Sequence, residues 1–95
     1  MKIYSNATNR NEATVIVDIK FPYSPTFYGY RYYIAFKDGS SIYEYLTNDT
    51  KLYNSLEEGG MYRISYVRTS PKLIAPNTAS IYVEWSRVRL IEKVN

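Results

Sequence analysis

The clearest pattern of hydrophobic and polar positions lies in residues 30–47, where two alternating stretches flank a short polar turn. Alternation with a period of two predicts β-strands, because successive side chains of a strand point to opposite faces. Glycine tolerates a positive φ, so Lys37-Asp38-Gly39 predicts a three-residue hairpin loop that ends on the glycine. The chain is therefore organised around a β-hairpin.

The length of this turn decides which side chains share a face of the hairpin. A three-residue loop pairs Ile34 with Ile42 and Tyr30 with Leu46, which gives an apolar face that should look inward. The outward face then carries three tyrosines flanked by two cations: Arg31, Tyr33, Lys37, Tyr43 and Tyr45. A two-residue Asp38-Gly39 loop would instead gather a different set on one face: Tyr32, Ile34, Phe36, Tyr43 and Tyr45. We favour the three-residue loop because it separates aliphatic side chains from aromatic and charged ones more cleanly.

Three further strands are predicted by the same alternation. They are expected over residues 14–21, 61–68 and 80–94. An aromatic loop at 22–29 is expected to lead into the hairpin, and a long loop at 69–79 to join the last two strands. In the last strand the apolar parity slips near Ser86 or Arg87. A β-bulge would cause this slip, because it adds one residue to the strand and re-aims the side chains beyond it.

One short helix is expected between the hairpin and the strand that begins at residue 61. Asn48-Asp49-Thr50 supplies capping side chains, and Gly59-Gly60 can end the helix through a left-handed residue. Leu52 and Leu56 fall at helical spacing. We expect two to three turns, with these leucines plugging the core.

Length and composition narrow the classes of protein. The 95 residues predict an N-terminal arm over residues 1–12 and one domain over 13–95. Cysteine and histidine are absent, which removes the usual zinc sites and the Ser-His-Asp and Cys-His arrangements, and the carboxylates show no metal-binding or acid/base spacing. We therefore expect no enzyme, metal or cofactor. Without a long apolar run or an N-terminal signal sequence, no membrane association and a cytoplasmic location are expected.

The order of elements resembles the OB-fold, a family of small oligonucleotide- and oligosaccharide-binding barrels. The resemblance rests on the helix between the third and fourth strands, on the passage from Leu56 to Tyr62 into strand four, and on the two long loops. It implies an all-β, five-stranded Greek-key barrel with little helix. An SH3-like barrel is the alternative, although it normally lacks that helix. The Tyr- and Ile-rich composition also resembles small proteins of hyperthermophilic archaea and their viruses or plasmids.

In the OB family, a ligand lies across strands two and three, flanked by the loops after strands one and four. Carried onto this chain, this implies a site of aromatic rings and cations: Phe27, Tyr28, Arg31, Tyr33, Lys37, Tyr43, Tyr45, Arg63 and Lys72. Twelve tyrosines and a net charge of +3 suit stacking of unpaired bases, with cations along the phosphates. We expect binding of single-stranded nucleic acid, DNA or RNA, with DNA favoured. The alternative is a protein-interaction or assembly module that uses the tyrosine-rich face as a homodimer contact.

Overall fold

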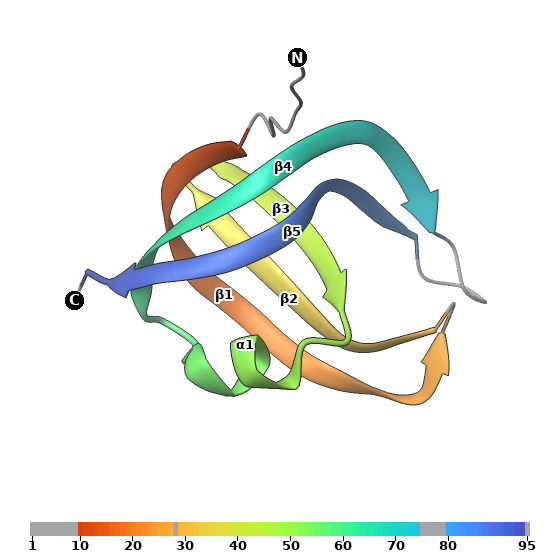
Figure 1. Cartoon of the computed structure of the whole chain (residues 1–95). Coiled ribbons are helices and arrows are strands. Elements are labelled where there is room, and N and C mark those ends of the chain that lie inside the picture. Colours follow the sequence, from red (N-terminus) through yellow and green to blue (C-terminus); the bar gives the residue numbers. More distant parts are fainter. Residues whose placement is uncertain (1–9, 28, 75–79, 95) are drawn as a thin grey trace, which may run out of the picture.

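The computed structural model describes residues 10–27, 29–74 and 80–94, and the side chains of residues 23–27 lie outside this description. These described residues form an all-β, OB-like barrel of five strands with one short helix between the third and fourth (Figure 1). The elements are β1 (Arg10–Phe27), β2 (Tyr30–Asp38), β3 (Ser41–Thr47), α1 (Thr50–Ser55), β4 (Met61–Ile74) and β5 (Ile81–Lys93). The predicted fold class is confirmed.

The strands close into a ring in the order β1-β2-β3-β5-β4, with β4 returning to β1. Four of the neighbouring pairs are antiparallel and have long ladders. The fifth pair, β3 with β5, is parallel and is joined in the described residues by one bridge, Glu44 to Val83. The barrel is therefore closed by four strong interfaces and one weak one.

The main core fills the barrel interior and is centred on Trp85. This side chain is 1% exposed, and it stacks on Tyr66 and Tyr43 with ring centroids 3.9 and 4.3 Å away. The helix α1 lies across one end of the barrel, where its N-cap Asp49 accepts a hydrogen bond from Leu52 N (Figure 1). Leu52 and Leu56 are both buried in this core, as the helical spacing predicted.

The favoured register of the β2–β3 hairpin is wrong. Asp38 pairs with Ser41, so the turn is Gly39-Ser40, and Gly39 has φ +63°, as a two-residue hairpin turn with a leading glycine requires. Ile34 consequently pairs with Tyr45, and both point into the main core. The distribution of side chains between faces is that of the less favoured two-residue loop, although the turn lies one residue further along the chain.

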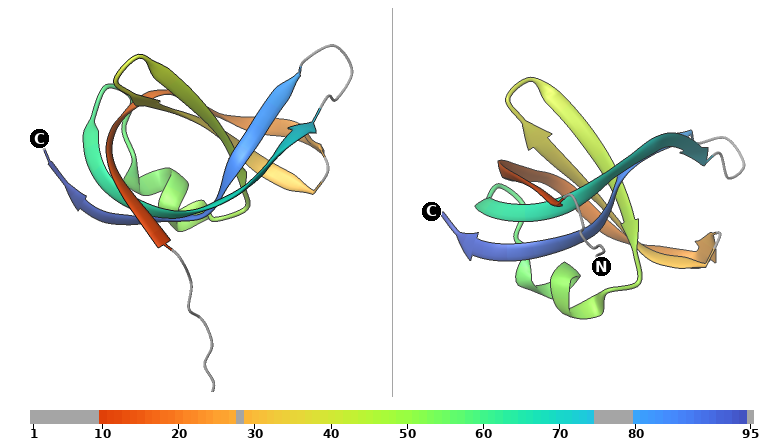
Figure 2. Two further views of the ribbon diagram at one scale, coloured as in Figure 1. Left: turned by 90° about the horizontal axis from the view of Figure 1, so that it is seen from above. Right: turned by 45° about the horizontal axis from the view of Figure 1, so that its top comes forward.

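Part of the outer face of the hairpin is also buried. Separating aliphatic from aromatic side chains therefore led to the wrong register, because both kinds of side chain are buried on both faces. Tyr33, Ala35 and Leu46 pack on the outer face against Ile74 and Ile81 in a second apolar cluster, which we call the outer cluster. The C-terminal part of β4, up to Ile74, and the N-terminal part of β5, from Ile81, extend beyond the barrel, and we call them the far ends of these strands. They bend over on the side where β1 ends and β2 begins (Figure 1). Figure 2 shows these ends on the same side of the barrel from two further directions.

Several elements differ in length from the prediction. β1 begins at Arg10 and runs through the expected aromatic loop to Phe27, and β4 continues through the first part of the expected long loop, to Ile74. This extension allows β4 to reach the outer cluster. The helix α1 has six residues, fewer than two turns, and it ends at Ser55 rather than at the glycines.

The predicted β-bulge in β5 is confirmed. Ser65 pairs with Arg89 whereas Val67 pairs with Ser86, so β5 holds one extra residue at this point. Trp85 and Val88 are both buried, three positions apart, as the slip in apolar parity indicated. Arg87 lies in the bulge with φ +52°.

Candidate functional site

The three tyrosines of the predicted binding face do not form an exposed platform. Tyr33 points outward but is buried in the outer cluster, where its hydroxyl donates to Glu44 Oε2 at 2.6 Å and its ring stacks on Phe21. Tyr43 and Tyr45 lie on the opposite, inner face. The prediction that these rings share an exposed face is wrong, because the turn is shorter and β4 and β5 cover the outer face.

Tyr45 is part of the barrel wall. Its hydroxyl accepts a hydrogen bond from Val88 N at 3.1 Å, and burial raises the pKa of its phenol. Tyr45 thereby links β3 to β5 beyond the point where their backbones stop pairing. Its phenol oxygen has a structural role as the acceptor of this hydrogen bond. Tyr45 also lines a cavity that is described below.

The predicted cations are spread over the molecule. Arg31 and Lys37 are exposed, Lys37 close to the tip of the hairpin. Arg63 binds two carboxylates, Glu12 at 2.7 Å and Glu92 at 2.9 Å, and its hydrogen bond to Glu92 raises its pKa. The remaining predicted cation, Lys72, lies on the far part of β4.

Two further predicted residues cannot be placed with the others. Tyr28 and the side chain of Phe27 lie outside the described residues. Of the seven predicted site residues whose side chains the structure describes, only Tyr45 and Lys72 lie together, in the wall of a cavity.

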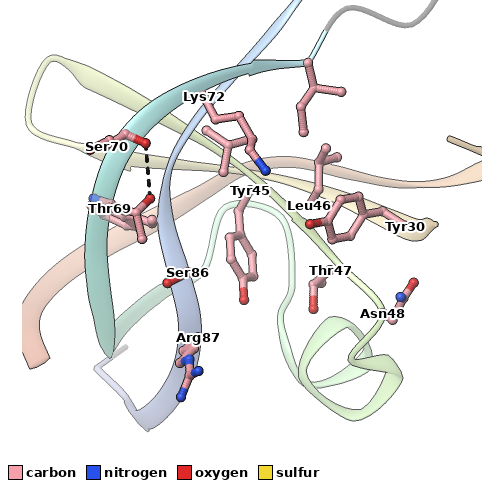
Figure 3. Close-up of a pocket in the computed structure, with 13 residues that line it drawn as sticks. Tyr30, Tyr45, Leu46, Thr47, Asn48, Thr69, Ser70, Lys72, Ser86 and Arg87 are labelled. Carbon is pink, nitrogen blue, oxygen red and sulfur yellow. Dashed lines mark hydrogen bonds between the residues drawn. The ribbon is translucent and has the colours of Figure 1, made fainter. Parts of the chain in front are cut away.

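This cavity of about 540 Å³ opens where β3 and β5 diverge beyond the Glu44–Val83 bridge. Figure 3 shows Tyr30 and Asn48 on one side of it, Thr69, Ser70 and Lys72 of β4 on the other, and Arg87 at one end. The Lys72 amino group points toward the interior of the cavity in this view. Its volume falls within the range of about 300–1,000 Å³ that is usual for small-molecule sites.

The chemistry of the cavity wall combines one half-exposed aromatic ring with cations and neutral polar groups. Tyr30 supplies the ring, and Lys72 and Arg87 supply positive charge. None of the described residues that line the cavity is a carboxylate. Trp85 is part of the wall, and its buried indole Nε1 has no hydrogen-bond partner within the described residues. The cavity can therefore accept a flat ring and an anionic group together.

The bulge in β5 is what brings Arg87 to this cavity. A non-glycine residue at positive φ costs about 1–3 kcal/mol, so the surrounding structure must hold Arg87 in place. Its carbonyl oxygen accepts a hydrogen bond from Arg10 Nη2, which ties the bulge to the start of β1. Bulges that re-aim a side chain are common beside functional sites.

Sequence reasoning missed Tyr30 and Arg87 as members of the site. The alternation along β2 predicts an inward Tyr30, whereas Tyr30 lines the cavity and packs against the outer cluster. The hairpin register does not account for this difference, because Ile34 faces inward in both registers and Tyr30 has the same parity. Arg87 carried a usable signal, since the parity slip in β5 marked its position. The missing information was the curvature that carries β4 over the barrel.

Comparisons of the chain with protein family models, with curated proteins and with solved structures find no match. Within the described ranges, no helix is long and apolar enough to cross a membrane. In the same part of the chain, no three acidic side chains gather in a way that could hold a metal ion. The chemistry of the candidate site is therefore inferred from its lining residues and their geometry alone.

Proposed function

We propose that this protein binds single-stranded nucleic acid at the cavity between β3 and the far parts of β4 and β5. The observation that carries the proposal is the composition of the wall: the Tyr30 ring, the Lys72 and Arg87 cations, and no carboxylate among the described lining residues. A nucleotide offers the complementary groups, a flat base and a negatively charged phosphate.

In this proposal one base stacks on Tyr30 while neighbouring phosphates contact Lys72 and Arg87. Hydroxyl and amide groups of Thr69, Ser70 and Asn48 can exchange hydrogen bonds with the edge of the base or with the sugar. A stacked base is worth about 1–3 kcal/mol by substitution of the aromatic residue, so a single ring contributes a large share of the affinity of a small site.

The test is a titration with oligo-dT and, in parallel, oligo-rU, followed by fluorescence. Trp85 is the only tryptophan and belongs to the cavity wall, so a bound base should quench its emission. Tyr30→Leu keeps apolar packing against the outer cluster but removes the aromatic face, and it should weaken binding by about 1–3 kcal/mol. Tyr30→Phe should bind like the parent protein.

Charge is tested with a matched pair of lysines. Lys72→Gln should weaken binding and lower the salt dependence, by about 0.7 in the slope of log K against log salt for each phosphate that the protein no longer neutralises. Lys37→Gln removes the same charge from an exposed position close to the hairpin tip, and it should bind like the parent.

The comparison of dT with rU decides which sugar is preferred; we expect the DNA strand to bind more tightly. The proposal fails if neither oligonucleotide quenches Trp85, or if Tyr30→Leu and Lys37→Gln behave alike. A dimer whose formation depends on protein concentration and ignores oligonucleotide would favour the assembly module instead.

A further inference from the structure

Three arginines lie close together on the outside of the barrel, where β5 passes β4 and the start of β1. We call Arg10, Arg87 and Arg89 the arginine cluster. Ser65 pairs with Arg89 across β4 and β5, so their side chains share the outward face. Arg10 donates to Ser65 Oγ from Nη2 at 2.9 Å and from Nε at 3.2 Å, and Nη2 also donates to the carbonyl oxygen of Arg87.

These bonds hold the Arg10 guanidinium against Ser65, the cross-strand partner of Arg89, and against the backbone of Arg87. Burial and the positive charges of Arg89 and Arg87 lower the pKa of Arg10. Arginine stays charged at any physiological pH, so the three guanidinium groups repel one another throughout this range.

No carboxylate neutralises the cluster in the part of the chain that the structure describes. The ion pairs found there use other cations, namely Arg63, Arg68 and Lys93. Glu12 shares the row of Ser65, but its carboxylate binds Arg63 at 2.7 Å. Asp49 lines a small cavity together with Arg89, yet its carboxylate caps α1 through Leu52 N.

The backbone of β5 is shaped to present these charges. The bulge adds Arg87 to the strand at positive φ while Arg89 returns to the regular outward row. Strained backbone that is held in place by neighbouring contacts is characteristic of binding sites. The arginine cluster therefore combines uncompensated charge with a fixed geometry.

We infer that the arginine cluster is a binding site for phosphate groups. Guanidinium groups bind phosphate through paired, charge-assisted hydrogen bonds, and neighbouring arginines can share the several oxygens of one phosphate or of two linked phosphates. Arg87 belongs both to the cluster and to the wall of the cavity. The extension to nucleic acid rests on the proposed function: the strand whose base occupies the cavity continues over the cluster, which takes its next phosphates.

The first arm of the test uses inorganic pyrophosphate, which has no base. Pyrophosphate should raise the melting temperature of the parent protein at constant ionic strength. Arg89→Gln should lose most of this rise, because the side chain is exposed and its removal leaves the Arg10 contacts in place. Lys37→Gln, which removes a charge at a distant position, should keep the rise.

The second arm separates binding from folding at the bulge. Arg87→Gly relieves the positive φ, so it should melt at a higher temperature than the parent without ligand, yet gain less from pyrophosphate. If Arg87 had only a structural role, Arg87→Gly would raise the melting temperature without reducing the shift that pyrophosphate causes. Equal pyrophosphate shifts in the parent, Arg89→Gln and Arg87→Gly would overturn the inference.

The third arm measures the salt dependence of oligo-dT binding. Arg89→Gln should lower the slope by about 0.7 for one phosphate contact. If pyrophosphate acts through Arg89 but oligo-dT does not bind, the phosphate site stands and the proposed function falls. If oligo-dT binds with an unchanged slope and pyrophosphate acts without Arg89, the proposed function stands and the inference about the cluster falls.

Discussion

The β2–β3 hairpin buries apolar side chains on both faces, and the two faces are buried in different ways. The inner face, with Ile34, Phe36 and Tyr45, is enclosed by the whole barrel and packs around Trp85. The outer face, with Tyr33 and Leu46, packs against the far ends of β4 and β5, and Phe21 of β1 stacks on Tyr33. Burial on the inner face therefore depends on closure of the ring, whereas burial on the outer face depends on one long pair of strands.

This difference predicts two kinds of stability in one small domain. Loss of inner packing should unfold the chain as a unit, because each strand contributes to the barrel core. Loss of outer packing should release the β4–β5 ends and leave the barrel closed, as cooperative units of different stability do in other proteins. The candidate cavity lies at the border between these two regions.

The largest expected effect comes from Trp85→Ala. Removing a fully buried tryptophan should lower the free energy of unfolding by about 3–5 kcal/mol, because a large cavity replaces the ring between Tyr43 and Tyr66. Denaturant unfolding measures the change. Trp85→Phe retains part of the stacking and should fall between the parent and Trp85→Ala; equal losses for both variants would contradict the central role of this stack.

Ile81→Ala should have a smaller effect of a different kind. The loss should lie near the lower end of the range for such a truncation, about 2 kcal/mol, because the β4–β5 ends can readjust over the outer cluster. Amide hydrogen exchange should rise in the far parts of β4 and β5 while the barrel stays protected. Leu73→Ala is the matched control, since this side chain is 59% exposed on the same pair of strands. Uniform loss of protection across the barrel would erase the distinction between the two faces.

The smallest expected effect is that of Tyr45→Phe, a substitution on the inner face whose effect is measured as the dependence of stability on pH. At neutral pH the loss of the hydroxyl leaves Val88 N unpaired and should cost about 1 kcal/mol, the low end of the range for a buried donor without a partner. The pKa of Tyr45 is raised in the folded chain, so the unfolded state loses its proton first and stability falls as pH rises above about 10. Tyr45→Phe should therefore flatten the alkaline part of the stability curve. Tyr82→Phe, at an exposed position, should leave its shape unchanged.

Much of the fold was predictable from local pattern. Alternation located all five strands, helical spacing placed Leu52 and Leu56 in the core, and the parity slip located the bulge at Arg87. Each of these depends on residues that are neighbours in the sequence. The resemblance to the OB-fold then supplied the right order of elements for a closed barrel.

The binding face was not predictable in the same way. Two hairpin turns of different length both suit the Lys37-Asp38-Gly39-Ser40 sequence, and only the packing of Tyr45 and Phe36 around Trp85 decides between them. Whether Tyr33 meets water depends on how far β4 continues, which is a contact between residues distant in the sequence. Nucleic-acid binding and the resemblance in composition to archaeal proteins stay predictions.

The single described bridge between β3 and β5 gives the barrel a direction of mechanical weakness. A force that separates β3 from β5 meets one backbone bridge and two hydrogen bonds that involve side chains, from Val88 N to the Tyr45 hydroxyl and from Tyr82 N to Glu44 Oε1. A force across the other interfaces meets a full ladder. Stretched between anchors on β3 and β5, the molecule should yield first along this seam. Stretched between β4 and β5, it should resist much longer, so that the rupture force depends on the axis of pulling.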